Sequence, residues 1–210
     1  MPSPLKPQQR QGGRQPERRA PTLFDLDLGD LVQFDGRDWF VENRLLYDEE
    51  GFRWLEYLLR DGSSQGWLCV EEDDWLELSW FEPCRSSEPL PPISWLQEFP
   101  HDLGWGGRTY LLRGQGKATL LSGLRAMAQP RETCRYADYE AEDGALLALE
   151  LWPPQGGRPS PTAGPGALEL SLGRRLDPAS VAVLPGDGRS VYRPEAAGVP
   201  QLGSSGRTPR

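Results

Sequence analysis

Residues 23–83 read LFDLDLGDLVQFDGRDWFVENRLLYDEEGFRWLEYLLRDGSSQGWLCVEEDDWLELSWFEP, and this stretch decides the fold class. Short aromatic and aliphatic runs alternate in it with the turn sequences DGR, DEEG, DGSSQG and EEDD, a pattern that predicts an antiparallel β-meander. Such short strands with tight turns favour a small, strongly bent barrel of the SH3 or Tudor kind. The predicted strands are Leu31–Phe34, Trp39–Leu46, Phe52–Arg60, Trp67–Glu71 and Trp75–Phe81.

The last of these strands shows which of its residues share a face. Leu76, Leu78 and Trp80 alternate with Glu77 and Ser79, and side chains two residues apart project from the same side of a strand. We therefore expect this strand to be half exposed, with one apolar face on the core and one polar face in water.

The chain has eight tryptophans, and an aromatic side chain of this size can bury about 200 Å². Trp54, Trp67 and Trp75 lie inside apolar runs, so we assign them to the core. Trp39 and Trp80 stand close to charged residues and are expected to be partly exposed.

Strand signals return in the second half of the chain. Leu168, Leu170 and Leu172 alternate there with Glu169 and Ser171, the clearest period-two pattern in the sequence. The fold class is therefore predicted to be all-β, with a second β-rich half docked on the SH3/Tudor-like first half. The further predicted strands are Thr109–Arg113, Ala118–Leu121, Thr133–Tyr139, Ala145–Trp152, Ala167–Leu172 and Val181–Leu184, and residues 120–129 could instead form a short helix.

Composition divides the chain further. Residues 1–22 and 194–210 lack a pattern that could be buried, so both tails are predicted to be disordered, the first of them basic. Residues 23–83 form the acidic, aromatic-rich β domain, and residues 84–108 a proline-rich connector that is expected to be ordered. Residues 109–193 form the second β half, in which the Pro/Gly-rich segment 153–166 is a flexible loop.

Charge narrows the class of partner. Residues 21–98 carry nineteen acids against five bases, and an acidic domain repels the phosphate backbone, so nucleic acid is a poor partner for it.

No apolar run approaches the roughly 20 residues of a membrane span, and the start has no apolar core of a signal peptide. Three cysteines without a paired spacing fit reduced thiols, so we expect a cytoplasmic protein.

The acidic turn is the candidate binding site. Glu71, Glu72, Asp73 and Asp74 are consecutive, so their side chains splay apart; we expect a solvated turn and no metal site, because the EF-hand pattern is absent. Together with the aromatic Trp39 and Trp80 they are proposed to bind a basic protein or peptide.

Motifs for catalysis and for phosphate binding are incomplete in this sequence. His101 next to Asp102 lacks a nucleophile elbow, and the RGQGKATLLSG stretch, residues 113–123, departs from the phosphate-loop motif at two positions, which favours a glycine-rich turn between strands. We therefore predict no catalytic residue and no cofactor. The enzyme alternative is a carboxylate-based hydrolase or lyase that uses Asp138, Glu140 and Glu150.

Residues 29–80, and above all RWLEYLLRD at 53–61, resemble a bacterial family named domain of unknown function 4178. That resemblance implies no established activity. Its members resemble accessory proteins encoded beside membrane-stress and polyamine-related genes, which implies a partner-binding role. Because the chain has one histidine and no complete nucleophile, metal or phosphate motif, we predict a non-catalytic protein-interaction or accessory module; a purely structural subunit is a further alternative. The matching residues are Trp54, Tyr57, Leu58, Gly66, Trp67, Leu68, Glu71 and Trp75, then Gly116, Ala118, Thr119, Tyr136, Asp138, Tyr139, Glu150 and Trp152.

Overall fold

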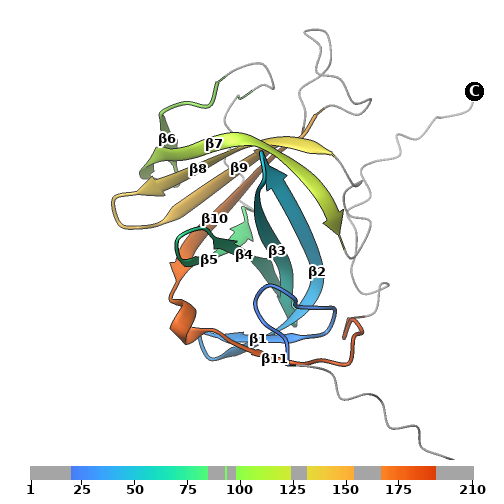
Figure 1. The fold of residues 1–210 in the computed structure, drawn as a ribbon. Coiled ribbons are helices and arrows are strands. Elements are labelled where there is room, and N and C mark those ends of the chain that lie inside the picture. The colour runs from blue at the N-terminus through green and yellow to red at the C-terminus, as the bar shows by residue number, and fades with distance from the viewer. Residues whose placement is uncertain (1–19, 85–92, 94–97, 124–131, 154–166, 193–210) are drawn as a thin grey trace, which may run out of the picture.

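The structure is a computed structural model of the 210-residue chain and describes residues 20–84, 93, 98–123, 132–153 and 167–192. The prediction of an all-β fold is confirmed, since strands dominate these residues (Figure 1). The elements are β1 (Leu31–Phe34), β2 (Arg37–Glu49), β3 (Phe52–Asp61), β4 (Ser64–Glu72), β5 (Leu76–Pro83), β6 (Asp102–Trp105), β7 (Arg108–Gly123), β8 (Thr133–Ala141), β9 (Leu146–Leu151), β10 (Leu168–Leu176), the 3-10 turn η1 (Pro178–Ser180) and β11 (Ala182–Leu184).

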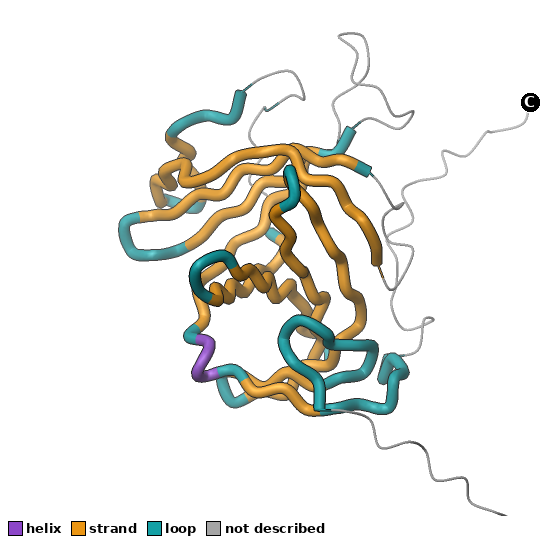
Figure 2. Tube along the Cα trace, viewed as in Figure 1, coloured by secondary structure: helices purple, strands orange, loops and turns teal. Residues whose placement is uncertain are grey.

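Eight of these strands close into one antiparallel barrel in the order β2-β3-β4-β5-β10-β9-β8-β7. The two halves of the chain meet at three ladders: β1 pairs with β11, β5 pairs with β10, and β7 pairs back onto β2 with Tyr47 opposite Leu120. One edge of β2 pairs with β3. Its other edge is shared, because its first residues pair with β1 and its last residues pair with β7. A bulge between Val41 and Asn43 interrupts its register with β3, and bulges bend strands (Figure 2).

The first half curls around an apolar core of its own, on the face of β2–β5 that β1 and β11 cover. Trp39 stacks on Phe34 with ring centroids 5.4 Å apart and lies 4.7 Å from the ring of Trp80. The predicted partial exposure of Trp39 and Trp80 is wrong, because they are only 3% and 4% exposed under β1. Trp75, which we assigned to the core, is 66% exposed because it lies in the turn before β5.

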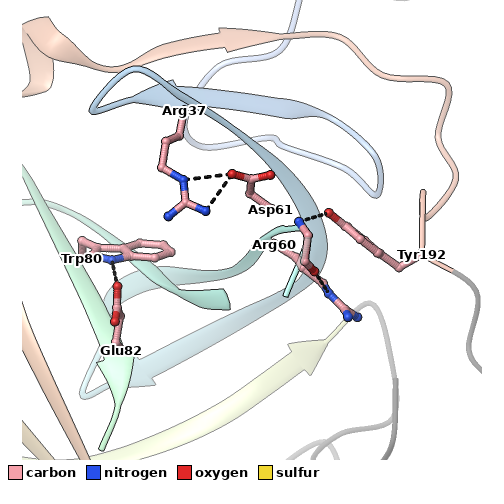
Figure 3. Close-up of polar contacts among 7 residues, drawn as sticks. Arg37, Arg60, Asp61, Trp80, Glu82 and Tyr192 are labelled. Carbon is pink, nitrogen blue, oxygen red and sulfur yellow. Dashed lines mark hydrogen bonds and ion pairs between the residues drawn. The ribbon is translucent and has the colours of Figure 1, made fainter. Parts of the chain in front are cut away.

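Polar contacts surround this core (Figure 3). Nε1 of Trp80 donates to Oε1 of Glu82 at 3.1 Å, so the buried indole keeps a partner. The guanidinium of Arg37 reaches Asp61 at 2.7 Å, and the Tyr192 hydroxyl accepts from the backbone N–H of Gly62 at 2.7 Å. The last contact holds the C-terminal end of the described chain against the β3–β4 turn.

A second core lies on the outer face of β7–β10. Leu147, Leu149 and Leu151 of β9 are buried there against Phe99 and Leu103 of the connector. The connector is therefore ordered where it is described, at residues 84, 93 and 98–107. The connector also contains β6, a strand that was not expected from the sequence because the surrounding prolines disfavour the hydrogen-bonded ladder of a sheet.

β7 differs most from prediction. It is one strand of 16 residues, whereas the sequence suggested two strands joined by a turn at Gly114–Lys117. Gly116 pairs with Tyr136 within the β7–β8 ladder, and the only irregularity of that ladder is a register shift between Leu112 and Gly114. The predicted disordered tails, the flexible loop and most of the possible helix lie outside the described residues, at 1–19, 124–131, 154–166 and 193–210.

Candidate functional site

The barrel encloses a cavity of about 450 Å³. All eight barrel strands contribute residues to its wall, from Leu45 and Tyr47 on β2 to Ser171 on β10. An eight-stranded barrel is just wide enough to be filled by side chains or to hold one small ligand. This cavity falls in the size range of small-molecule sites, about 300–1,000 Å³.

Strand alternation explains why the wall is polar. On β9, Ala148 and Glu150 line the cavity, whereas Leu147 and Leu149 border it but are fully buried in the second core. On β4, Trp67 and Cys69 line the cavity, whereas Leu68 and Val70 face the first core. The apolar faces of the strands therefore point out of the barrel, toward β1, β11 and the connector, and the mixed aromatic and acidic faces point inward.

Aromatic rings form one part of the cavity wall around Trp54. Its ring stacks on Tyr47 at 5.2 Å, meets Tyr136 edge-on at 5.7 Å and lies 6.1 Å from Phe52. These rings pack with small and aliphatic residues of β2, β7 and β8 into a third cluster. Desolvation by burial raises the pKa of the Tyr47 and Tyr136 hydroxyls, so both remain neutral donors.

Five carboxylates project into the same space from five different strands: Glu56, Glu71, Asp138, Glu150 and Glu169. Glu56, Glu71 and Glu150 are half-buried, whereas Asp138 and Glu169 are more exposed to the open volume of the barrel. Desolvation by burial, followed by repulsion from neighbouring carboxylates, raises the pKa of Glu56 and of Asp138 to about 7. The same two causes hold the pKa of Glu150 well above its usual range. Glu56 and Asp138 therefore exchange protons near neutral pH.

Glu140 differs from these five carboxylates. Arg175 binds one of its oxygens at 2.8 Å and Arg113 lies 3.5 Å from the other. The hydrogen bond and charge of Arg175, with a contribution from Arg113, lower the pKa of Glu140. This carboxylate stays ionised and contacts both arginines of the cavity wall.

Glu49 fastens β2 to β7 and β8 at the closure of the barrel. Its carboxylate accepts from the Tyr136 hydroxyl at 2.5 Å and from the backbone N–H of Lys117 at 2.8 Å. A side chain on Gly116 would overlap this carboxylate, which explains the glycine there. The contact fixes Tyr136 in the aromatic wall.

The residues of the sequence-predicted binding site do not come together. Glu71 lines the cavity, whereas Glu72, Asp73 and Asp74 are exposed at the end of β4 and in the following turn. Trp39 and Trp80 lie in the first core, on the other face of the sheet. The acidic turn is solvated, as the sequence suggested, but its aromatic neighbour is Trp75.

Sequence reasoning missed Glu56 and Glu169 as site residues and placed Trp54 in a closed core. A signal was present: each acid alternates with apolar residues along a strand, so it had to face something polar. Of the residues weighed for an enzyme, Asp138 and Glu150 do face the cavity, and Glu140 is held by arginines.

The other candidates lie apart from the cavity. His101 and Asp102 pair at 2.7 Å but are 81% and 64% exposed. Among the described residues, no three His, Cys, Asp or Glu side chains converge closely enough to hold a metal ion. All three cysteines are free thiols, and burial raises the pKa of Cys69 and Cys134. The described part of the chain contains no helix that is long and apolar enough to span a membrane.

The fold and the cavity define a closed antiparallel β-barrel with an acidic, aromatic interior. The chain belongs to the family described as domain of unknown function (DUF4178), which matches residues 27–178 and confirms the resemblance seen in the sequence. An uncharacterized protein of Aquifex aeolicus is 28% identical over 134 residues, which cover 62% of this chain and 72% of the relative. Uncharacterized proteins of Mycobacterium bovis and Mycobacterium tuberculosis are 30% identical over 156 residues, covering 67% of this chain and 71% of theirs. No solved structure matches the chain.

Proposed function

We propose that this protein is a non-catalytic binding module that holds a small amphipathic ligand inside its barrel. The observation that carries this proposal is the cavity of about 450 Å³ with aromatic rings on one part of its wall and polar groups on another. Apolar walls with a few converging polar groups are typical of ligand sites. Two of the three apolar clusters lie outside the barrel, and the third, around Trp54, leaves the cavity open beside it.

The proposal is tested by filling the cavity. Ala148→Trp places an indole in the cavity from β9, and it is expected to weaken binding of the small neutral fluorophore 1-aminoanthracene at least about tenfold. The measurement is fluorescence titration of the full chain. Ala182→Trp, an equal change on the exposed β11, is the control and should bind like the wild type. Equal binding by wild type and Ala148→Trp would show that the fluorophore does not occupy the barrel.

A second candidate function is the binding of a basic protein or peptide at the acidic turn. It is favoured by the exposure of Trp75, which follows directly on Glu72, Asp73 and Asp74 and donates from Nε1 to Glu77 at 2.6 Å. An exposed aromatic ring flanked by acids suits a cationic partner surface. Trp39 and Trp80 would support this surface only from beneath, as part of the first core.

Reversing Glu72, Asp73 and Asp74 to lysine is expected to slow association with a polyarginine peptide about tenfold at low salt, because exposed charges act mainly on the on-rate. Surface plasmon resonance at two salt concentrations measures this. The triple change leaves the cavity wall untouched, so 1-aminoanthracene binding serves as the fold control. Peptide association that ignores both salt and the reversal would exclude the turn as a binding surface.

A carboxylate-based hydrolase or lyase is the enzyme alternative. It is supported by Asp138 and Glu150, which share the cavity and have raised pKa values, as a general acid requires. We favour binding because the same carboxylates belong to a ring of acids around the wall, with no single pair set apart. The free thiols support a reducing, cytoplasmic location, and the gene neighbourhoods implied by the family support a link to membrane-stress or polyamine-related systems.

A further inference from the structure

The charges on the cavity wall do not balance. Among the described residues, eight carboxylates and two arginines line the cavity. Both arginines, Arg113 and Arg175, contact the same carboxylate, that of Glu140. No basic side chain pairs with any of the five inward carboxylates in the described part of the chain, and the charges that act on Glu56, Glu71, Asp138 and Glu150 are those of other acids. A buried carboxylate without a cation is costly, so positive charge from outside would be favourable there.

The positions of these carboxylates indicate what kind of cation could supply that positive charge. They come from β3, β4, β8, β9 and β10, and they lie around the barrel wall instead of meeting at one point. No three of the described acids, cysteines or histidines approach closely enough for a metal ion. A metal ion needs several ligands at one point, whereas an organic ammonium ion can bind one or two of these acceptors at a time through its N–H donors.

The neighbouring aromatic wall indicates what else the ligand carries. Nε1 of Trp54 donates to Oε1 of Glu56 at 3.2 Å, so the carboxylate and the indole are joined at one place on β3. The Trp54 ring continues into the stacked pair with Tyr47 and the edge contact with Tyr136. Aromatic faces attract cations and pack well against alkyl groups.

We infer that the barrel ligand is an organic cation of the alkylammonium class, whose alkyl chain lies on the aromatic wall around Trp54 while its ammonium group lies among the carboxylates of Glu56, Asp138 and Glu150. This inference rests on the proposed ligand-binding function and adds the chemical class of the ligand. Eight carboxylates against two arginines leave the wall with an excess of acids, which disfavours an anionic head group.

The test uses three probes that differ only in their head group: octylamine, octan-1-ol and octanoate. Isothermal titration of the full chain is expected to show octylamine binding at least about tenfold more tightly than octan-1-ol, and octanoate binding more weakly than both. Glu56→Gln and Asp138→Asn should each weaken octylamine about tenfold and leave octan-1-ol unchanged. Glu72→Gln, an equal change on the exposed turn, should alter neither.

The outcomes separate this inference from the function on which it rests. Octan-1-ol or octanoate binding as tightly as octylamine would overturn the cationic class while leaving ligand binding in the barrel intact. Octylamine affinity that survives both cavity substitutions would also overturn it, because the ammonium group would then lie elsewhere. If none of the three probes binds and 1-aminoanthracene is also excluded, ligand binding in the barrel fails as well.

Discussion

Replacing Trp39 with alanine is expected to lower the free energy of unfolding by about 3–5 kcal/mol, the cost of deleting a buried aromatic side chain. Trp39 is 3% exposed and lies between the rings of Phe34 and Trp80, with the guanidinium of Arg37 4.2 Å above it. Its removal would leave a cavity where β1, β2 and β5 meet. Urea denaturation followed by circular dichroism measures the loss.

Trp75→Ala is the matched control, because it removes the same side chain from a position that is 66% exposed. Its effect is expected to stay within about 0.5 kcal/mol. The two substitutions together test the first core. The sequence pattern placed Trp75 in the core and Trp39 partly in solvent, so it predicts the larger loss of stability for Trp75→Ala. A Trp75→Ala protein that is less stable than Trp39→Ala would contradict the packing described for this core.

The second large effect concerns pH. The pKa of Glu56 and of Asp138 is raised to about 7 by burial in the barrel and by repulsion from other acids, among them Glu71 and Glu169. The folded protein therefore holds protons that the unfolded chain releases above about pH 4. The stability contributed by these protonated groups is fully present below about pH 4 and is lost as the pH rises through about 7.

Glu56→Gln should therefore be more stable than the wild type at pH 8, by about 1–2 kcal/mol once screening by water in the cavity is allowed for, and nearly equal to it at pH 4. Urea denaturation at both pH values gives the difference. Glu140→Gln should act in the opposite direction, because Arg175 stabilises the ionised form of that carboxylate. A Glu56→Gln protein that loses stability at pH 8 would mean that the Glu56 carboxylate has a cationic partner in the folded chain.

Much of the local structure could be predicted from the sequence because strands and turns depend on neighbouring residues. Turn sequences such as DGR and DGSSQG, with Gly36 and Gly62 at positive φ, place the hairpins β1–β2 and β3–β4 where they were expected. β7 was divided wrongly because Gly114 and Gly116 look like a turn. Gly116 is instead needed to make room for the Glu49 carboxylate, which comes from another strand far away in the chain.

The site was harder to predict than the strands, for one physical reason. The alternation of Leu168, Leu170 and Leu172 with Glu169 and Ser171 correctly shows which residues share a face. A polar face that meets bulk water and one that meets a water-accessible cavity have the same sequence pattern, because both need polar side chains. The pattern therefore does not distinguish these two environments for Glu169 and Ser171, which line the cavity.

Local turn chemistry and period-two alternation are enough to predict from the sequence that this protein is all-β, where most of its strands lie, and which side chains share a face of each strand. Which face became the inside depends on contacts between strands that are far apart in the chain. The pairing of β2 with β7 and of β5 with β10 joins residues far apart in the chain, and it is this closure that turns a set of acidic strand faces into the wall of one cavity.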